Sequence, residues 1–184
     1  MAAEIRASDP RRIEVLRPTA PKVDSADIWL VVRLETLDLG EKQIEALFDL
    51  ARKWSSAGNM LAGIQIDFDA NTRGLDGYAD FLKDFRKRLP AQYQLSVTGL
   101  LDWSANGNPE QLRDLANIID EVVFQTYQDR ETISGYQKWL RNLNELPMPF
   151  RIGLVQNGKW SEPKNLQQNP KFMGYVVFLL NPES

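Results

Sequence analysis

The sequence contains neither cysteine nor histidine. The chain can therefore form no disulfide, no thiolate nucleophile and no Ser-His-Asp triad, and it offers no His or Cys ligand for zinc. Any acid–base chemistry must be carried out by Asp, Glu, Tyr or Lys side chains. These absences exclude more mechanisms than any single motif in the sequence supports.

The sequence also lacks a long apolar run and an excess of basic charge. No segment approaches the about eighteen apolar residues of a membrane span, and residues 1–6 do not begin a signal peptide. The net charge of −3 provides no basic surface for nucleic acid. We expect no membrane span and no nucleic-acid partner. As written, the chain is expected in the cytoplasm, or in the periplasm or outside the cell if it is part of a longer parent.

With 184 residues the chain is long enough for one sizeable core, but short for an eight-fold βα barrel of about 200 to 250 residues. Residues 1–26 are expected to be irregular, with one short strand at 13–16, and residues 27–184 to form the main domain. Within that domain, apolar and β-branched runs predict strands at 27–35, 62–70, 94–101, 121–128, 150–156 and 174–180. Helical spacing of apolar residues predicts helices at 41–56, 75–89, 110–119 and 134–146. This alternation predicts an α/β fold with a parallel sheet, similar to a TIM barrel.

The strand at 62–70 is unusual because one of its faces is acidic. Side chains alternate across a strand, so the two faces have different characters. The apolar face carries Ile64, Ile66 and Phe68, and the polar face carries Gln65, Asp67 and Asp69. In a parallel barrel, the carboxyl ends of the strands are where chemistry takes place. We therefore predict a functional site around Asp67 and Asp69.

The segment Gly63 to Asp69 resembles the Gly-x-(Gln/Glu)-x-Asp-(Tyr/Phe)-Asp motif of the bacterial family catalogued as domain of unknown function 3142. The similarity runs from Trp29 through most of the chain. The segment resembles more distantly the fourth barrel strand of chitinase-like glycoside hydrolases of family 18, Asp-Gly-x-Asp-x-Asp-x-Glu. Only one of the four acids of that pattern is matched in type. The resemblance implies an incomplete barrel of about six or seven strands, with the first strand or two missing.

The second resemblance implies roles for individual residues. Asp69 takes the place of the catalytic glutamate, Asp67 is the charged partner that orients it, and Tyr127 resembles a tyrosine that lies beside the substrate's acetamido group. Further residues expected to contact carbohydrate are Gln65, Gln125, Gln156, Trp103, Arg33 and Glu35. Two acids without a recognisable ligand loop are too few to predict a Mg²⁺ or Ca²⁺ site, so we expect no metal and no cofactor.

Two other hypotheses remain open at this point. The chain could bind a glycan without catalysis, which needs the same polar groups but no proton donor. Alternatively, the charged residues form an internal network without a ligand, in which Arg33 pairs with Asp67 because buried charges are usually paired. An incomplete barrel also leaves exposed sheet edges, through which the chain can associate with another copy.

Overall fold

The computed structural model describes residues 1–24, 26–103, 107–164 and 166–178. Its main feature is one eight-stranded sheet with the strand order β10-β9-β6-β5-β4-β3-β1-β2. The strands are β1 (Ala3–Ile5), β2 (Glu14–Val15), β3 (Ile28–Leu34), β4 (Leu61–Asp67), β5 (Gln94–Leu100), β6 (Glu121–Gln125), β9 (Phe150–Val155) and β10 (Phe172–Phe178). Neighbouring strands are parallel except β2, which is antiparallel to β1.

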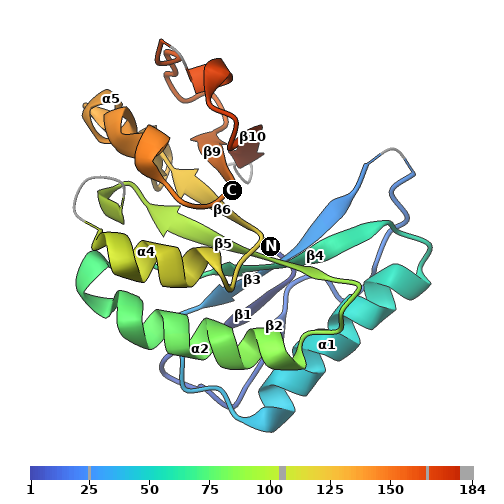
Figure 1. Cartoon of the computed structure of the whole chain (residues 1–184). Coiled ribbons are helices and arrows are strands. Elements are labelled where there is room, and N and C mark those ends of the chain that lie inside the picture. The colour runs from blue at the N-terminus through green and yellow to red at the C-terminus, as the bar shows by residue number, and fades with distance from the viewer. Residues whose placement is uncertain (25, 104–106, 165, 179–184) are drawn as a thin grey trace.

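The helices lie between the strands along the chain. They are α1 (Glu41–Ser56), α2 (Leu75–Arg88), α4 (Pro109–Ala116) and α5 (Tyr136–Trp139), with 3₁₀ turns η1 (Thr72–Gly74), η2 (Leu140–Glu145) and η3 (Leu166–Gln168). Figure 1 shows α1, α2 and α4 together on one side of the sheet. Because the parallel strands follow chain order across the sheet, every connection turns the same way, as in a barrel.

The barrel is not closed. Strands β10 and β2 form the two ends of the sheet, and no backbone pairing joins them in the part of the chain that the structure describes. The expected α/β fold, an incomplete TIM-like barrel, is confirmed. Its inner face, which neighbouring strands would cover in a complete barrel, is accessible from the open side.

The hydrophobic core fills the space between the sheet and the helices. Ile64 and Ile66 of β4 pack there with Leu47, Tyr78 and Phe85 of the helices, and all five are buried. Gly63 allows β4 and β5 to approach closely, since a Cβ at this position would lie 2.0 Å from the Gln94 carbonyl oxygen. One face of β4 is thus fixed by the core, which directs the alternate polar residues to the inner face.

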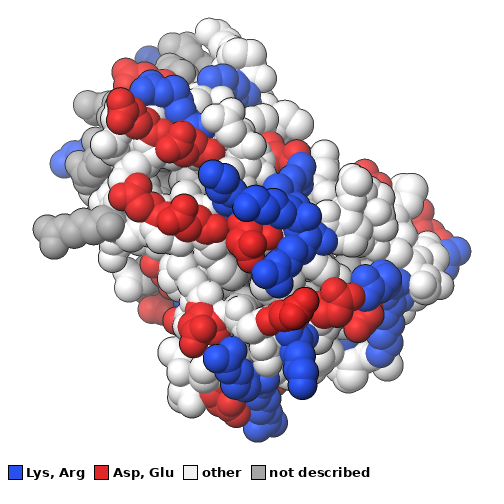
Figure 2. Space-filling model, turned by 60° about the horizontal axis from the view of Figure 1, so that its bottom comes forward, with Lys and Arg blue, Asp and Glu red and all other residues white. Residues whose placement is uncertain are grey.

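The outer surface of the helices is charged and largely self-compensating. Figure 2 shows basic and acidic side chains next to one another on this side of the molecule. Arg52 pairs with Glu45 and Asp49 on α1, and Arg88 pairs with Asp84 on α2. Such exposed pairs contribute little to stability, and they are typical of a solvated surface. Among the described residues, no helix is both long and apolar enough to cross a membrane.

Several elements differ from the expected ones. Strand β1 lies in a segment that was expected to be irregular, because three residues give too short a pattern to recognise. The predicted strand at 121–128 ends at Gln125, and a short hairpin of β7 (Tyr127–Gln128) and β8 (Glu131–Thr132) follows. The predicted helix at 134–146 divides into α5 and the 3₁₀ turn η2. The end of the predicted strand at 174–180 lies outside the described residues.

Candidate functional site

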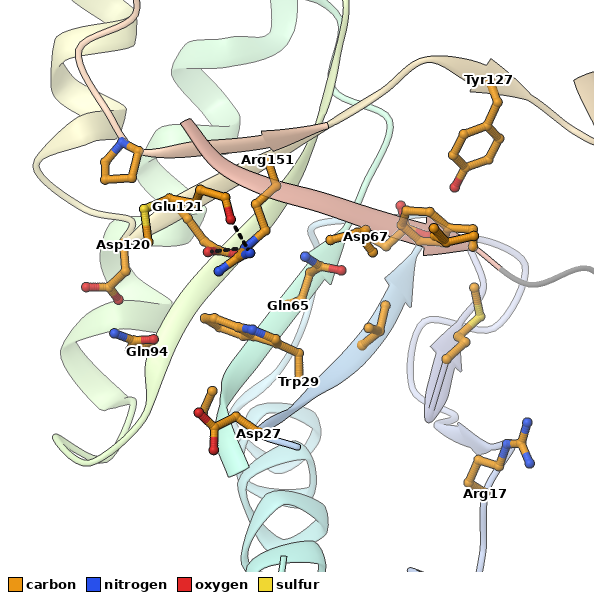
Figure 3. Close-up of a pocket in the computed structure, with 18 of the residues that line it drawn as sticks. Arg17, Asp27, Trp29, Gln65, Asp67, Gln94, Asp120, Glu121, Tyr127 and Arg151 are labelled. Atoms are coloured by element: carbon orange, nitrogen blue, oxygen red, sulfur yellow. Dashed lines mark hydrogen bonds and ion pairs between the residues drawn. The ribbon is translucent and has the colours of Figure 1, made fainter. Parts of the chain in front are cut away.

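A large cavity of about 1450 Å³ lies on the inner face of the sheet. Figure 3 shows its lining residues, which come from the middle of the sheet and from both of its ends. The polar and aromatic residues that line it are Arg17, Asp27, Trp29, Gln65, Asp67, Gln94, Asp120, Glu121, Tyr127, Arg151 and Phe178. The cavity exists because the open barrel leaves its inner side chains uncovered.

Asp67 is the centre of a hydrogen-bonded group near the carboxyl ends of the strands. Its Oδ1 accepts hydrogen bonds from Arg33 Nη1 at 3.2 Å, Thr98 Oγ1 at 2.8 Å and Gln125 Nε2 at 3.5 Å. Arg33 Nη2 also donates to Asp69 Oδ2 at 2.5 Å. We call these five residues the Asp67 cluster. It joins β3, β4, β5 and β6, so it ties together four neighbouring strands.

The two carboxylates of the Asp67 cluster differ in exposure. The Asp67 side chain is 9% exposed, whereas that of Asp69, which follows the end of β4, is 52% exposed. The single guanidinium of Arg33 pairs with both. The hydrogen bond to Asp69 is the main reason that the pKa of Arg33 is raised, so Arg33 remains a cation. Asp69 is therefore the carboxylate of this cluster that a ligand can reach.

Tyr127 lies beside the Asp67 cluster, just beyond the end of β6. Its ring packs against Phe178 of β10, with ring centroids 5.2 Å apart. Burial raises the pKa of Tyr127, and the charges of Asp67 and Asp69 raise it further. Its hydroxyl therefore stays protonated at neutral pH and can donate a hydrogen bond to a ligand.

A second polar group lies deeper along the same face. Gln65 Nε2 donates to Ser96 Oγ at 2.9 Å, and Ser96 Oγ donates to Glu121 Oε1 at 3.3 Å. Arg151 Nε donates to Glu121 Oε2 at 2.9 Å, and Arg151 Nη1 donates to the Met173 carbonyl oxygen at 2.6 Å. We call Gln65, Ser96, Glu121 and Arg151 the Glu121 cluster. Its Glu121 side chain is only 8% exposed, so the ion pair with Arg151 compensates a buried charge.

The chain matches a family whose description is a domain of unknown function, DUF3142, over residues 24–160. The chain belongs to this family. The matched range includes all five residues of the Asp67 cluster and all four of the Glu121 cluster. Strand β10 lies outside it.

The other comparisons give less. No curated protein matches the chain. Among solved structures, the crystal structure of the Bacillus cereus spore cortex-lytic enzyme SleL is similar, with a TM-score of 0.41 and 18% sequence identity over 71% of this chain. The similar region covers 35% of the length of that chain.

In this DUF3142 chain, the structure brings together most of the predicted site residues. Asp67, Asp69, Arg33 and Gln125 are members of one hydrogen-bonded cluster, and Arg33 pairs with Asp67 as the sequence analysis considered. Gln65 and Tyr127 line the same cavity. These positions agree with a common site, and the roles of the residues in it remain predictions.

Trp103 does not lie in the cavity, contrary to the prediction. It is 1% exposed, packs against Tyr78 and Phe124, and donates from Nε1 to the Ala70 carbonyl oxygen at 2.8 Å. The chain turns after β5 so that this ring enters the core between the sheet and the helices. An aromatic residue just after a strand can point either way, and its sequence position alone did not decide between them.

Glu35 and Gln156 are also absent from the cavity lining. Glu35 follows β3, and its Oε2 accepts a hydrogen bond from the Ala7 backbone amide at 3.0 Å. Gln156 follows β9, and its backbone amide donates to the Phe178 carbonyl oxygen at 2.9 Å. Both residues are near strand ends, but they serve connections to neighbouring strands.

The sequence analysis missed Trp29, Thr98, Ser96, Glu121 and Arg151. The signal was present, because each residue belongs to a strand whose alternate residues are apolar core. What the sequence could not supply was the register between strands, which places Ser96 opposite both Gln65 and Glu121. Within the described ranges, no group of three or more acidic side chains is arranged to hold a metal ion.

Proposed function

We propose that this chain binds carbohydrate in the cavity on the inner face of its open barrel. The observation that carries the proposal is the combination of aromatic rings and planar hydrogen-bonding groups in one cavity. Trp29 and Tyr127 lie apart, and Figure 3 shows Gln65 and Asp67 between them. Sugars present apolar C–H faces that stack on aromatic rings, and hydroxyl groups that pair with amides and carboxylates.

The size of the cavity supports a ligand longer than one sugar ring. Small-molecule pockets usually measure about 300 to 1,000 Å³, and this cavity of about 1450 Å³ is larger. Its lining also runs from Trp29, near the start of β3, to Tyr127, beyond the end of β6. The resemblance of residues 63–69 to chitinase-like glycoside hydrolases points to the same class of ligand.

Hydrolysis is a second candidate function, favoured by the exposure of Asp69 at the carboxyl edge of the sheet. In this candidate, Asp69 is the proton donor, Asp67 is its charged partner and Tyr127 donates to the substrate. For Asp69 to donate a proton, its pairing with Arg33 must be broken when the substrate binds. Binding alone needs no such change, so we place it first.

The test is a panel of soluble oligosaccharides, acetamido sugars included, with binding measured by calorimetry and turnover by chromatography. Wild type is compared with Trp29→Ala and Asp69→Asn. Asp49→Asn is the matched control, because Asp49 also pairs with an arginine but lies on α1, away from the cavity. Thermal melting of every variant shows whether the fold is intact.

We expect the wild type to bind at least one oligosaccharide, and Trp29→Ala to bind it roughly tenfold more weakly or worse. Binding without turnover in the wild type supports the first proposal. Turnover that disappears in a normally folded Asp69→Asn, but not in Asp49→Asn, supports hydrolysis. If the wild type binds none of the sugars, the proposal is wrong and the clusters serve the stability of the sheet.

A further inference from the structure

The free edge of β10 lacks the features that usually protect a sheet edge. The strand has seven residues, and it is the last strand of the sheet on its side. Its sequence contains no charged residue and no proline. Met173 is 50% exposed and Val177 is 54% exposed, which is high for large apolar side chains. Natural proteins normally place charges, proline or a very short strand at such an edge.

The backbone of β10 also offers unpaired groups on this side. The Phe178 carbonyl oxygen accepts from the Gln156 amide of the β9 side at 2.9 Å. In a parallel pair, alternate residues bond to the neighbouring strand, so Val177 directs its N–H and C=O away from β9. Within residues 1–178 as described, no backbone group pairs with those of Val177. The edge is therefore suited to another strand, and not only to an apolar surface.

The opposite end of the sheet has the usual protection. Strand β2 has only two residues, and one of them, Glu14, pairs with Arg6 at 3.4 Å. Arg17 and Pro18 follow immediately. A charged, two-residue strand next to a proline is a poor template for pairing. Association of β10 with the β2 edge of another copy, which would continue into open chains of molecules, is therefore disfavoured.

We infer that β10 pairs antiparallel with β10 of a second copy, forming a two-fold symmetric dimer with one continuous sheet. A two-fold dimer uses the same edge of both molecules, so it requires only the unprotected edge. The uncharged sequence of β10 places no like charges opposite each other in this pairing. Val176 and Phe178 also line the cavity, so the partner's strand lies at the border of the cavity.

The experiment measures mass as a function of protein concentration, by light scattering and sedimentation equilibrium. Val177→Lys places two cations near each other across the two-fold axis, and Val177→Pro removes the N–H that faces the partner. Because this N–H faces away from β9, proline leaves the ladder to β9 intact. Met60→Lys is the matched control, since Met60 is the other strongly exposed apolar side chain, 62% exposed, and lies away from β10.

We expect wild type and Met60→Lys to convert from monomer to dimer as concentration rises. Val177→Lys should weaken dimerisation roughly tenfold or more at an unchanged melting temperature of the monomer. If Val177→Pro does not fold, Val177→Lys alone decides. A wild type that remains monomeric, a series of assemblies larger than the dimer, or a Val177→Lys variant that dimerises like the wild type would each overturn the inference.

Discussion

Arg33 and Asp67 join two neighbouring strands across the inner face of the sheet. Arg33 Nη1 lies 3.2 Å from Asp67 Oδ1, and the two residues are also register partners in the β3–β4 pair. Their side chains are 25% and 9% exposed, so this ion pair is largely removed from water. The pair belongs to the site that we propose for carbohydrate, and it also contributes to the stability of the sheet.

Replacing Arg33 by methionine should therefore destabilise the protein strongly. The substitution leaves the buried carboxylate of Asp67 without its counter-charge, which costs about 3 kcal/mol in the free energy of unfolding. Arg52→Met is the matched control, because Arg52 pairs with Glu45 and Asp49 at an exposed site and should cost less than about 1 kcal/mol. Urea denaturation measures both. Equal losses would show that the Arg33 pair has no special role in stability.

Gly63→Ala tests the close contact between β4 and β5. The new methyl group would lie 2.0 Å from the Gln94 carbonyl oxygen, so the strands must separate, at a cost of about 3 kcal/mol. Gly77→Ala provides the comparison, because it lies on α2 and a Cβ there meets nothing within 4 Å. That substitution should stabilise the helix by about 0.5 to 1 kcal/mol. Thermal melting of the pair checks both signs.

Tyr78→Phe should leave stability unchanged or raise it, by up to about 1 kcal/mol. Tyr78 is completely buried, and its hydroxyl has no hydrogen-bond partner among the described residues. The matched substitution is Tyr136→Phe. The Tyr136 hydroxyl donates to the Ser161 carbonyl oxygen at 3.1 Å and accepts from the Ser161 amide at 2.6 Å, so its loss should cost about 1 kcal/mol. A large destabilisation by Tyr78→Phe would reveal a partner for its hydroxyl, for instance a buried water.

Stability should fall at alkaline pH, partly through Tyr127. Burial, and then Asp67 and Asp69, raise the pKa of Tyr127 in the folded state above its unfolded value of about 10. The contribution of the protonated form is therefore complete below about pH 10, and it is lost as the pH rises from there through the raised pKa. Unfolding measured across this range should show a smaller alkaline loss in Tyr127→Phe than in the wild type. An identical pH dependence would contradict this assignment.

The sequence alone determined most of the local structure. The spacing of Ile44, Leu47, Phe48 and Ala51 predicted α1 with the bounds that the structure has, because an apolar stripe of this period can be buried only as a helix. The alternation in β4 likewise predicted that Asp67 faces away from Ile64 and Ile66. From the order of strands and helices followed the parallel sheet, since parallel neighbours require such crossovers.

Only the tertiary structure decided which side chains meet. The register between strands brings Glu121 to Ser96, and through it to Gln65, although these residues are far apart in the chain. It also shows that Trp103 enters the core while Trp29 lines the cavity. Local periodicity fixes the face of a strand but not its position relative to its neighbours. That position depends on how the helices and the sheet pack together over the whole chain.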